Sequence, residues 1–506
     1  MRDWLAHRAD ATPEAHALRD GSGAVTTYAA LDDTVEELAG RLSAHGVGVD
    51  DHVGVVTGTR PALVEVVHAS MRVGATLVPL DARATTPELA QRLDVADVDC
   101  LLCGADTAER AVDAAAGLDR DLPVAGFDGG TDGAADLLGT DPEAFEVPAL
   151  TPDGIEVMLF TSGTTGRPKA VCLTAANLAA SAAASAFRLG LDPEDRWHVA
   201  LPMYHMGGLA PVYRSVLYGT CVLVEDAREG FDPGRTLDVL DANDATCTSL
   251  VPTMLRRLLD AGEGTGNPFP DSLRFVLLGG APASEPLLDE CAERGVPASP
   301  TYGMTETASQ IATATPREAR DYSGTVGSPL LFTEVTVVGD DGRAVPRGER
   351  GELVVAGPTL TPGYYGETAS TREQFCSFGF RTGDVGYRDE AGRLYVLNRL
   401  DDRIITGGEN VDPGEVLDVV KAAPGVSDAA VVGLSDEEWG QRVAALLVAD
   451  GEFDRGSFDA HCRERLADYK LPRTVRLVDS VPRTASGTVD RAAVRERLLG
   501  AEPDEN

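Results

Sequence analysis

The feature that most constrains the fold is an alternation of amphipathic helices with short apolar strands over residues 1–330. On the first predicted helix, Leu31, Val35, Leu38 and Leu42 share one face, as a period of 3.6 residues requires. The clearest segments are a helix at 30–47, a strand at 51–58, a helix at 61–74 and strands at 75–80 and 155–160. This rhythm is typical of parallel sheets with crossover helices, so we predict an α/β protein.

The pattern changes after residue 330. Residues 333–357 read as short strands separated by turns, which predicts a small β-rich subdomain at about 330–400. A last α+β segment follows, with a helix at 415–423 and strands at 428–434 and 442–448. We therefore predict a large N-terminal domain over 1–400 and a small α+β C-terminal domain over 401–506.

Charge excludes several kinds of partner. The chain has 81 Asp and Glu against 44 Lys and Arg, a net charge of −37. Such a surface repels nucleic acids and anionic membranes, so neither is expected as a partner. Because the acidic residues are spread over segments with normal apolar periodicity, we interpret the chain as a folded protein adapted to molar salt. An acidic protein from an ordinary environment stays open as the alternative.

The apolar pattern, the first residues and the cysteines together favour a location inside the cell. No apolar stretch reaches the roughly 18–20 residues that a membrane helix needs, and residues 1–16 have no secretory pattern. A cytoplasmic enzyme is expected, and a homodimer is left open. Cys100 and Cys103 have CxxC spacing, but they lie in an apolar run with no second pair, which favours buried free thiols.

The strongest local motif begins at the end of a predicted strand. Hydroxyls and glycines can close around a phosphate through their donors and backbone N–H groups, and a lysine adds charge. The residues in question are Thr161, Ser162, Gly163, Thr164, Thr165, Gly166 and Lys169. Retention of Lys169 is informative because the other lysines are only Lys421 and Lys470. The motif is not a Walker A loop, since GxxxxGK[ST] is absent.

This loop resembles the phosphate loop of adenylate-forming enzymes, the family of acyl-CoA synthetases, luciferases and peptide-synthetase adenylation domains. The rest of that family's pattern follows in order over nearly the whole chain. The resemblance implies adenine and ribose contacts and, for Thr305 and Glu306, a place near the α-phosphate and Mg²⁺. The nucleotide-contacting residues it implies are Gly280, Ala281, Pro282, Tyr302, Gly303, Asp384 and Arg399.

The resemblance also implies the reaction. ATP activates a carboxylate as an acyl-adenylate, and the thiol of coenzyme A then attacks the same carbon. The C-terminal domain is implied to be mobile and to rotate about a hinge at Asp401 between the two steps. Gly407 and Gly408 would then line the channel for the pantetheine arm.

One position departs from the pattern. The family expects a lysine near the C-terminus that bridges carboxylate and α-phosphate, and Thr488 stands in its place. Losing one preorganised donor typically costs about 10²–10³ in rate. Arg483 or Arg491 is a candidate substitute, and Lys470 is a weaker one. A working enzyme is expected, with an impaired nucleotide-binding protein as the alternative of another class.

The acid pocket of this family is formed by the segment around His205 and by the one around Tyr302. Arg214 is informative, because a buried guanidinium suits a second carboxylate on the substrate. These segments resemble the o-succinylbenzoate–CoA ligases of menaquinone biosynthesis, whose substrate has two carboxylates. His205, Arg214, Thr307 and Ser309 are the predicted substrate contacts. An ion pair of Arg214 with a protein carboxylate, and another aromatic or medium-chain acid as substrate, stay open.

Overall fold

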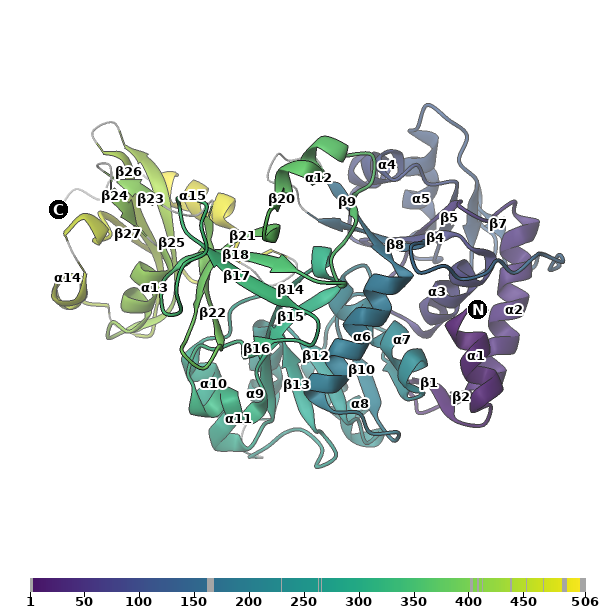
Figure 1. Ribbon diagram of the computed structural model, residues 1–506, viewed down its shortest axis with the longest axis horizontal. Coiled ribbons are helices and arrows are strands. Elements are labelled where there is room, and N and C mark those ends of the chain that lie inside the picture. Colours follow the sequence, from purple (N-terminus) through teal and green to yellow (C-terminus); the bar gives the residue numbers. More distant parts are fainter. Residues whose placement is uncertain are drawn as a thin grey trace. The chain divides into compact units, whose positions relative to one another are not determined.

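The computed structural model describes residues 3–161, 168–228, 230–262, 264, 266–400, 404–406, 409–411, 413–436, 439–451, 453–466, 468–484 and 489–500. The chain divides into two compact units (Figure 1). The first consists of Met1–Glu334 with Val355–Phe380, and the second of Val335–Val354 with Arg381–Asn506. Both units are discontinuous in sequence.

The first unit contains two large sheets. In the described residues, one has eight strands in the order β19-β9-β8-β4-β3-β5-β6-β7. Its strands are β3 (His52–Val56), β4 (Thr76–Leu80), β5 (Cys100–Cys103), β6 (Val124–Gly126), β7 (Ala135–Asp136), β8 (Ile155–Thr161), β9 (Lys169–Thr174) and β19 (Gly363–Tyr364). Neighbours β4, β3, β5 and β6 are parallel, whereas β9 runs antiparallel to both β8 and β19.

The second large sheet has nine strands in the described residues, in the order β16-β15-β14-β13-β12-β10-β11-β1-β2. They are β1 (His16–Asp20), β2 (Val25–Thr27), β10 (Arg196–Val199), β11 (Cys221–Val224), β12 (Cys247–Leu250), β13 (Phe275–Leu278), β14 (Ala298–Met304), β15 (Ser309–Thr313) and β16 (Ser328–Pro329). The run from β1 to β14 is parallel, and β15 turns back antiparallel to β14.

Helices cover both faces of each sheet, so the side chains of a strand point alternately into two cores. On β3, Val53 and Val55 face the core that contains α2 and α3, whereas Val56 faces α4 and α5. Figure 1 shows α4 and α5 on one side of β4 and β5, the neighbours of β3, and α3 on the other. The helices are α1 (Trp4–Ala11), α2 (Tyr28–Ala44), α3 (Pro61–Val73), α4 (Thr86–Val95), α5 (Ala108–Ala116), α6 (Ala175–Leu189), α7 (Met206–Tyr218), α8 (Pro233–Ala242), α9 (Pro252–Ala261), α10 (Glu285–Arg294), α11 (Pro316–Asp321) and α12 (Thr368–Gln374).

Local signals explain where these helices begin. Helix α2 starts two residues before the predicted boundary at residue 30, because the Thr27 hydroxyl accepts a hydrogen bond from the N–H of Ala30. Helix α3 has Pro61 at its first turn and ends at Gly74, whose φ of 77° is left-handed. The predicted limits of this helix, 61–74, agree with the structure to one residue.

Two smaller sheets follow, and most of their residues belong to the second unit, whereas β20 belongs to the first. A five-stranded sheet joins β17 (Glu334–Val338), β18 (Gly351–Ala356), β20 (Phe375–Cys376), β21 (Gly379–Arg388) and β22 (Leu394–Arg399). Another contains β23 (Ile404–Thr406), β24 (Glu409–Val411), β25 (Val426–Asp436), β26 (Gly440–Ala449) and β27 (Thr474–Leu477). Its helices are α13 (Pro413–Lys421), α14 (Arg455–Arg465) and α15 (Arg491–Leu499).

The predicted α/β class is confirmed, with parallel strands, crossover helices and a smaller C-terminal α+β portion. The domain boundary at 400 stays a prediction. Cys100 and Cys103 are free and buried, as expected. Within the described part of the chain, no helix is long and apolar enough to cross a membrane.

Candidate active site

The phosphate-loop motif lies at the open end of the β8–β9 pair. Thr161 and Lys169 face each other as the last register pair of these antiparallel strands. Ser162, Gly163, Thr164, Thr165 and Gly166, which join them, lie outside the described residues. The Lys169 ammonium lies 4.9 Å from the centre of the Tyr364 ring, so the lysine side chain rests on an aromatic face.

Glu306 contacts the same tyrosine and lies in the 3₁₀ turn η1 (Thr305–Thr307). Its side chain is buried, and its carboxylate Oε1 accepts a hydrogen bond of 3.0 Å from the Tyr364 hydroxyl. The Glu306 carbonyl accepts a second bond of 2.8 Å from the N–H of Thr361. Tyr364 therefore contacts both of the predicted charged residues, although the sequence analysis did not single it out.

Two predicted nucleotide-binding segments lie at the carboxyl ends of parallel strands, one at the end of β14 and one just after β13. A β-carbon on Gly303 would come within 1.6 Å of the Ser309 carbonyl oxygen, so only glycine fits where β14 meets β15. Gly280 has a φ of 78° and stands in the turn after β13, followed by Ala281 and Pro282. Carboxyl ends of parallel strands are where α/β proteins bind ligands.

Arg214 lies on α7 and is only 2% exposed. Its Nη2 donates to the Ser181 hydroxyl at 3.3 Å, and its guanidinium lies 5.6 Å from the Trp197 ring centre. Among the described residues, its Nε has no hydrogen-bond partner and no carboxylate pairs with its guanidinium. Burial lowers the pKa of the guanidinium from its usual value. The structure therefore gives no support to an ion pair of Arg214 with a protein carboxylate.

Ser181 connects Arg214 to the turn that contains the other predicted substrate contacts. The Ser181 hydroxyl donates to the Ala308 carbonyl at 2.6 Å. Ala308 and Ser309 both have positive φ, 50° and 112°, which is costly for residues with a β-carbon. Such strain often marks a functional turn. The Thr307 hydroxyl is buried and donates to the Met304 carbonyl at 3.0 Å, so it holds the turn closed.

His205 precedes the first residue of α7 and packs against Tyr204, with ring centres 4.7 Å apart. The Tyr204 hydroxyl accepts a hydrogen bond from Arg83, which also pairs with Asp81. Burial lowers the pKa of His205, which favours the neutral imidazole. Arg83 and Tyr204 are neighbours of the site that the sequence patterns did not reveal.

In the second unit, β21 and β22 bring two predicted ribose contacts together. Asp384 and Arg399 are register partners, and Arg399 Nη1 lies 3.3 Å from Asp384 Oδ1. Arg399 also donates to the Thr382 carbonyl at 3.2 Å. Asp401, Gly407, Gly408 and Thr488 lie outside the described residues.

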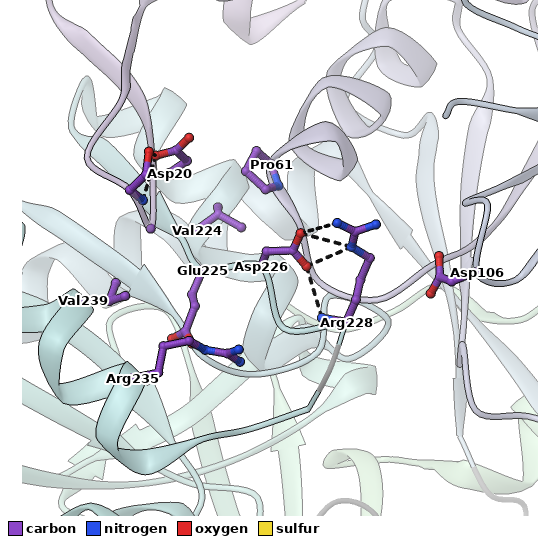
Figure 2. Close-up of a pocket in the computed structure, with 11 residues that line it drawn as sticks. Asp20, Pro61, Asp106, Val224, Glu225, Asp226, Arg228, Arg235 and Val239 are labelled. Atoms are coloured by element: carbon purple, nitrogen blue, oxygen red, sulfur yellow. Dashed lines mark hydrogen bonds and ion pairs between the residues drawn. The ribbon is translucent and has the colours of Figure 1, made fainter. Parts of the chain in front are cut away.

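A groove of about 790 Å³ lies elsewhere in the first unit, where strands β1, β5 and β11 end (Figure 2). None of the predicted site residues lines it. Its half-exposed arginines are paired, Arg228 with Asp226 and Arg235 with Glu225. The groove is therefore a junction of loops whose charges largely satisfy one another.

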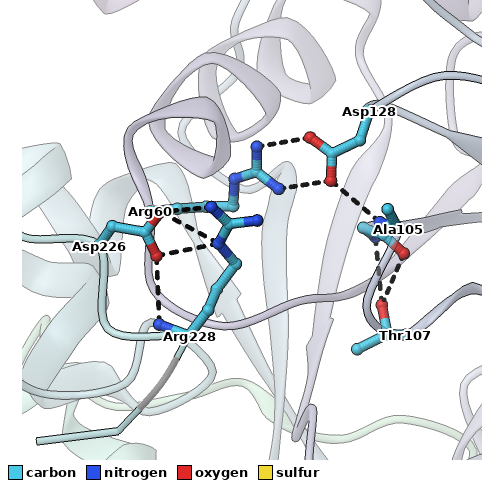
Figure 3. A network of polar contacts seen from close by, with 7 residues as sticks. Arg60, Ala105, Thr107, Asp128, Asp226 and Arg228 are labelled. Carbon is cyan, nitrogen blue, oxygen red and sulfur yellow. Dashed lines mark hydrogen bonds and ion pairs between the residues drawn. The ribbon is translucent and has the colours of Figure 1, made fainter.

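Figure 3 shows the polar network at one end of this groove. Arg60 makes a two-pronged ion pair with Asp128, and Asp128 also accepts a bond of 2.9 Å from the N–H of Ala105. Next to Arg60, the Thr59 carbonyl accepts a bond from Ala227, and the Thr59 hydroxyl accepts one from the N–H of Met203. Thr59 thus holds the chain at Met203, two residues before His205.

Comparisons with known proteins identify the family of the chain. The model of the AMP-binding enzyme family matches residues 5–365, and that of its C-terminal domain matches 415–488. The chain therefore belongs to the AMP-binding enzyme family. A 2-succinylbenzoate–CoA ligase from Geobacillus kaustophilus (strain HTA426) is 40% identical, over 99% of this chain and 98% of the relative.

Solved structures agree as well. The o-succinylbenzoate CoA synthetase (MenE) from Bacillus subtilis, in complex with the acyl-adenylate intermediate OSB-AMP, is 34% identical with a TM-score of 0.87, and covers 100% of this chain and 99% of its own. The same enzyme in complex with ATP and magnesium ion is 34% identical with a TM-score of 0.85, over 97% of this chain and 99% of its own.

Proposed function

We propose that this chain is an AMP-forming acid–CoA ligase acting on 2-succinylbenzoate. It would convert 2-succinylbenzoate, ATP and CoA into 2-succinylbenzoyl-CoA, AMP and pyrophosphate, a step of menaquinone biosynthesis. The observation that carries the substrate assignment is Arg214, a buried guanidinium with no carboxylate partner in the described part of the chain. A monocarboxylic acid would leave this charge unpaired, whereas the second carboxylate of 2-succinylbenzoate would neutralise it.

The first half-reaction needs the succinyl carboxylate to attack the α-phosphorus while pyrophosphate leaves. Lys169, with Thr161 and the loop from Ser162 to Gly166, is proposed to hold the phosphates. Tyr302, with Gly303 and the turn from Gly280 to Pro282, would hold adenine. Asp384 and Arg399 would hold the ribose. Thr305 would lie near the α-phosphate.

Glu306 is the residue proposed to hold Mg²⁺. When bound, the ion neutralises charge on the leaving pyrophosphate. Within the described residues, no three His, Cys, Asp or Glu side chains are grouped to hold a metal by themselves. A single buried carboxylate fits Mg²⁺, which commonly takes one or two carboxylates together with substrate phosphates and water. The donor set at Glu306 therefore suits this ion.

His205 would lie beside the reacting carboxylate. A neutral imidazole can donate one hydrogen bond to a carboxylate oxygen without trapping the acid as a tight ion pair. Ser309, next to the strained Ala308, is proposed to share the second carboxylate with Arg214, and Thr307 to shape the turn between them.

In the thiol step, Gly407 and Gly408 would line the pantetheine path, after a rotation about Asp401. Neither a different acid nor a non-catalytic nucleotide sensor is favoured by a described residue.

The assay is direct. The protein is incubated in molar KCl with ATP, Mg²⁺, CoA and 2-succinylbenzoate, with benzoate and octanoate as control acids, and the products are identified by mass spectrometry. We expect a CoA thioester and AMP with 2-succinylbenzoate alone. Thioester from a control acid at a similar rate would remove the substrate assignment, and no thioester from any acid would remove the ligase assignment.

The acidic surface supports a further part of this proposal, adaptation to molar salt in a cytoplasm rich in KCl. With a net charge of −37, self-repulsion opposes the compact state at low ionic strength. Because the Debye length falls to about 3 Å at 1 M salt, the melting temperature should rise between 0.1 and 2 M KCl. Differential scanning fluorimetry checks this, and a melting temperature that falls with added KCl would contradict it.

A further inference from the structure

We propose that Tyr364 is a positioning residue that holds Glu306 for Mg²⁺ with its hydroxyl and supports Lys169 with its ring. The inference rests on the proposed function and extends it to a residue outside the predicted site. Two contacts on opposite parts of one side chain carry it. The Tyr364 hydroxyl donates to Glu306 Oε1 at 3.0 Å, and the Lys169 ammonium lies 4.9 Å from the centre of the same ring.

The backbone around Tyr364 is held firmly in place. Strand β19 pairs with β9, placing Tyr364 opposite Val171, two residues after Lys169. The Thr361 hydroxyl donates to the Cys172 carbonyl at 2.5 Å, and the N–H of Tyr364 donates to the Thr371 hydroxyl at 3.0 Å. The phenol is thus fixed to the same strand that begins with Lys169.

Two residues of the segment from Thr361 to Tyr364 hydrogen-bond to Glu306. Thr361 binds its main-chain carbonyl, and Tyr364 binds its carboxylate. The terminal torsion of a glutamate is otherwise broad and twofold. Fixing it before the metal binds removes an ordering cost from the binding step. Hydrogen-bonded partners of metal ligands typically contribute about 10–100-fold to metal affinity.

The cation–π contact gives Tyr364 a separable second effect. Phenylalanine keeps the ring face but loses the hydroxyl, so Tyr364→Phe removes the hydrogen bond to Glu306 and keeps the aromatic face that contacts Lys169. Tyr364→Leu removes both contacts. Tyr365→Phe is the matched control, because the neighbouring Tyr365 hydroxyl bonds to Asp97 at 3.0 Å on a different part of the unit.

The test measures binding, so it does not depend on turnover. Mg²⁺ affinity is measured by titration calorimetry in the presence of saturating α,β-methylene-ATP, and nucleotide affinity is measured with Mg²⁺ removed. We expect Tyr364→Phe to raise the Mg²⁺ Kd about tenfold and to leave metal-free nucleotide binding unchanged. Tyr364→Leu should weaken both, and Tyr365→Phe should weaken neither.

A double-mutant cycle with Glu306→Gln separates positioning from a general loss of structure. In the Glu306→Gln background, Tyr364→Phe should no longer change the Mg²⁺ Kd, because the carboxylate it holds is gone. A Tyr364→Phe Kd within twofold of the unmodified protein would overturn the proposal, and so would equal losses in both backgrounds. A raised Mg²⁺ Kd in Tyr364→Phe, with no 2-succinylbenzoyl-CoA formed by the unmodified protein, would support the role of Tyr364 and reject only the substrate assignment.

Discussion

Replacing Arg214 by leucine is expected to lower kcat/KM for 2-succinylbenzoate by about 10²–10³-fold, the effect of truncating one partner of a buried charge pair. The guanidinium is buried against Ser181 and Trp197, and no carboxylate of the described residues forms an ion pair with it. Initial rates of CoA-thioester formation over a range of acid concentrations measure the change.

The same substitution should stabilise the protein. An unpaired guanidinium in an apolar setting costs free energy that leucine does not. The apparent melting temperature of Arg214→Leu should therefore rise by roughly 2–4 °C without substrate. Lost activity together with gained stability is the signature of a residue retained for binding, because replacing a structural arginine would lower the stability.

A truncated substrate and a matched variant complete this test. An acid that keeps the succinyl chain but lacks the benzoate carboxylate should be a poor substrate for the unmodified protein. Arg214→Leu should turn over this acid and 2-succinylbenzoate at similar rates.

Arg188→Leu, on neighbouring α6, removes an arginine that pairs with Glu318 and donates to the Thr313 carbonyl at 2.7 Å. It should lower the melting temperature and leave kcat/KM unchanged. Undiminished discrimination by Arg214→Leu would contradict the clamp.

The parallel core was predictable because its signal is local. The helix at 61–73 and the strand at 76–80 have the apolar period and the Pro and Gly boundaries that packing requires. The division into units was harder to foresee. Val355–Phe380 belongs with the first unit although the segments on both sides belong to the second. The periodicity of a short strand does not predict which other strands it will pair with.

The candidate site shows the same limit. Glu306 and Lys169 were identified from motifs, whereas Tyr364 and Arg83 were not. The hydrogen bond from Tyr364 spans 58 positions, and the one from Arg83 to Tyr204 spans 121. Nothing in the local sequence distinguishes Tyr364 from the adjacent Tyr365. Arg214 was found because a charge within an apolar helix face is unusual by itself, and only the structure showed that no described carboxylate neutralises it.

Replacing Thr488 by lysine is expected to raise the adenylation rate by about 10²-fold, the lower end of what one preorganised donor contributes. Thr488 stands where the resemblance predicts a bridging lysine, and two of the three candidate substitutes are already paired. Arg483 Nη2 lies 2.8 Å from Asp428 Oδ2, and Lys470 binds both oxygens of Glu415 at 2.6 Å. A cation already paired in this way must break its ion pair before it can serve the reacting carboxylate.

The two half-reactions provide the control. ATP–pyrophosphate exchange reports adenylation, whereas thioester formation from chemically prepared acyl-adenylate reports the second step alone. Thr488→Lys should accelerate the first and leave the second within twofold, and Thr488→Ala should change neither. If exchange in Thr488→Lys stays at the level of the unmodified protein, another cation already supplies the charge, and the prediction fails. Arg483→Ala and Arg491→Ala would then identify it, because the responsible arginine should reduce exchange by about 10²–10³ while the thioester step continues.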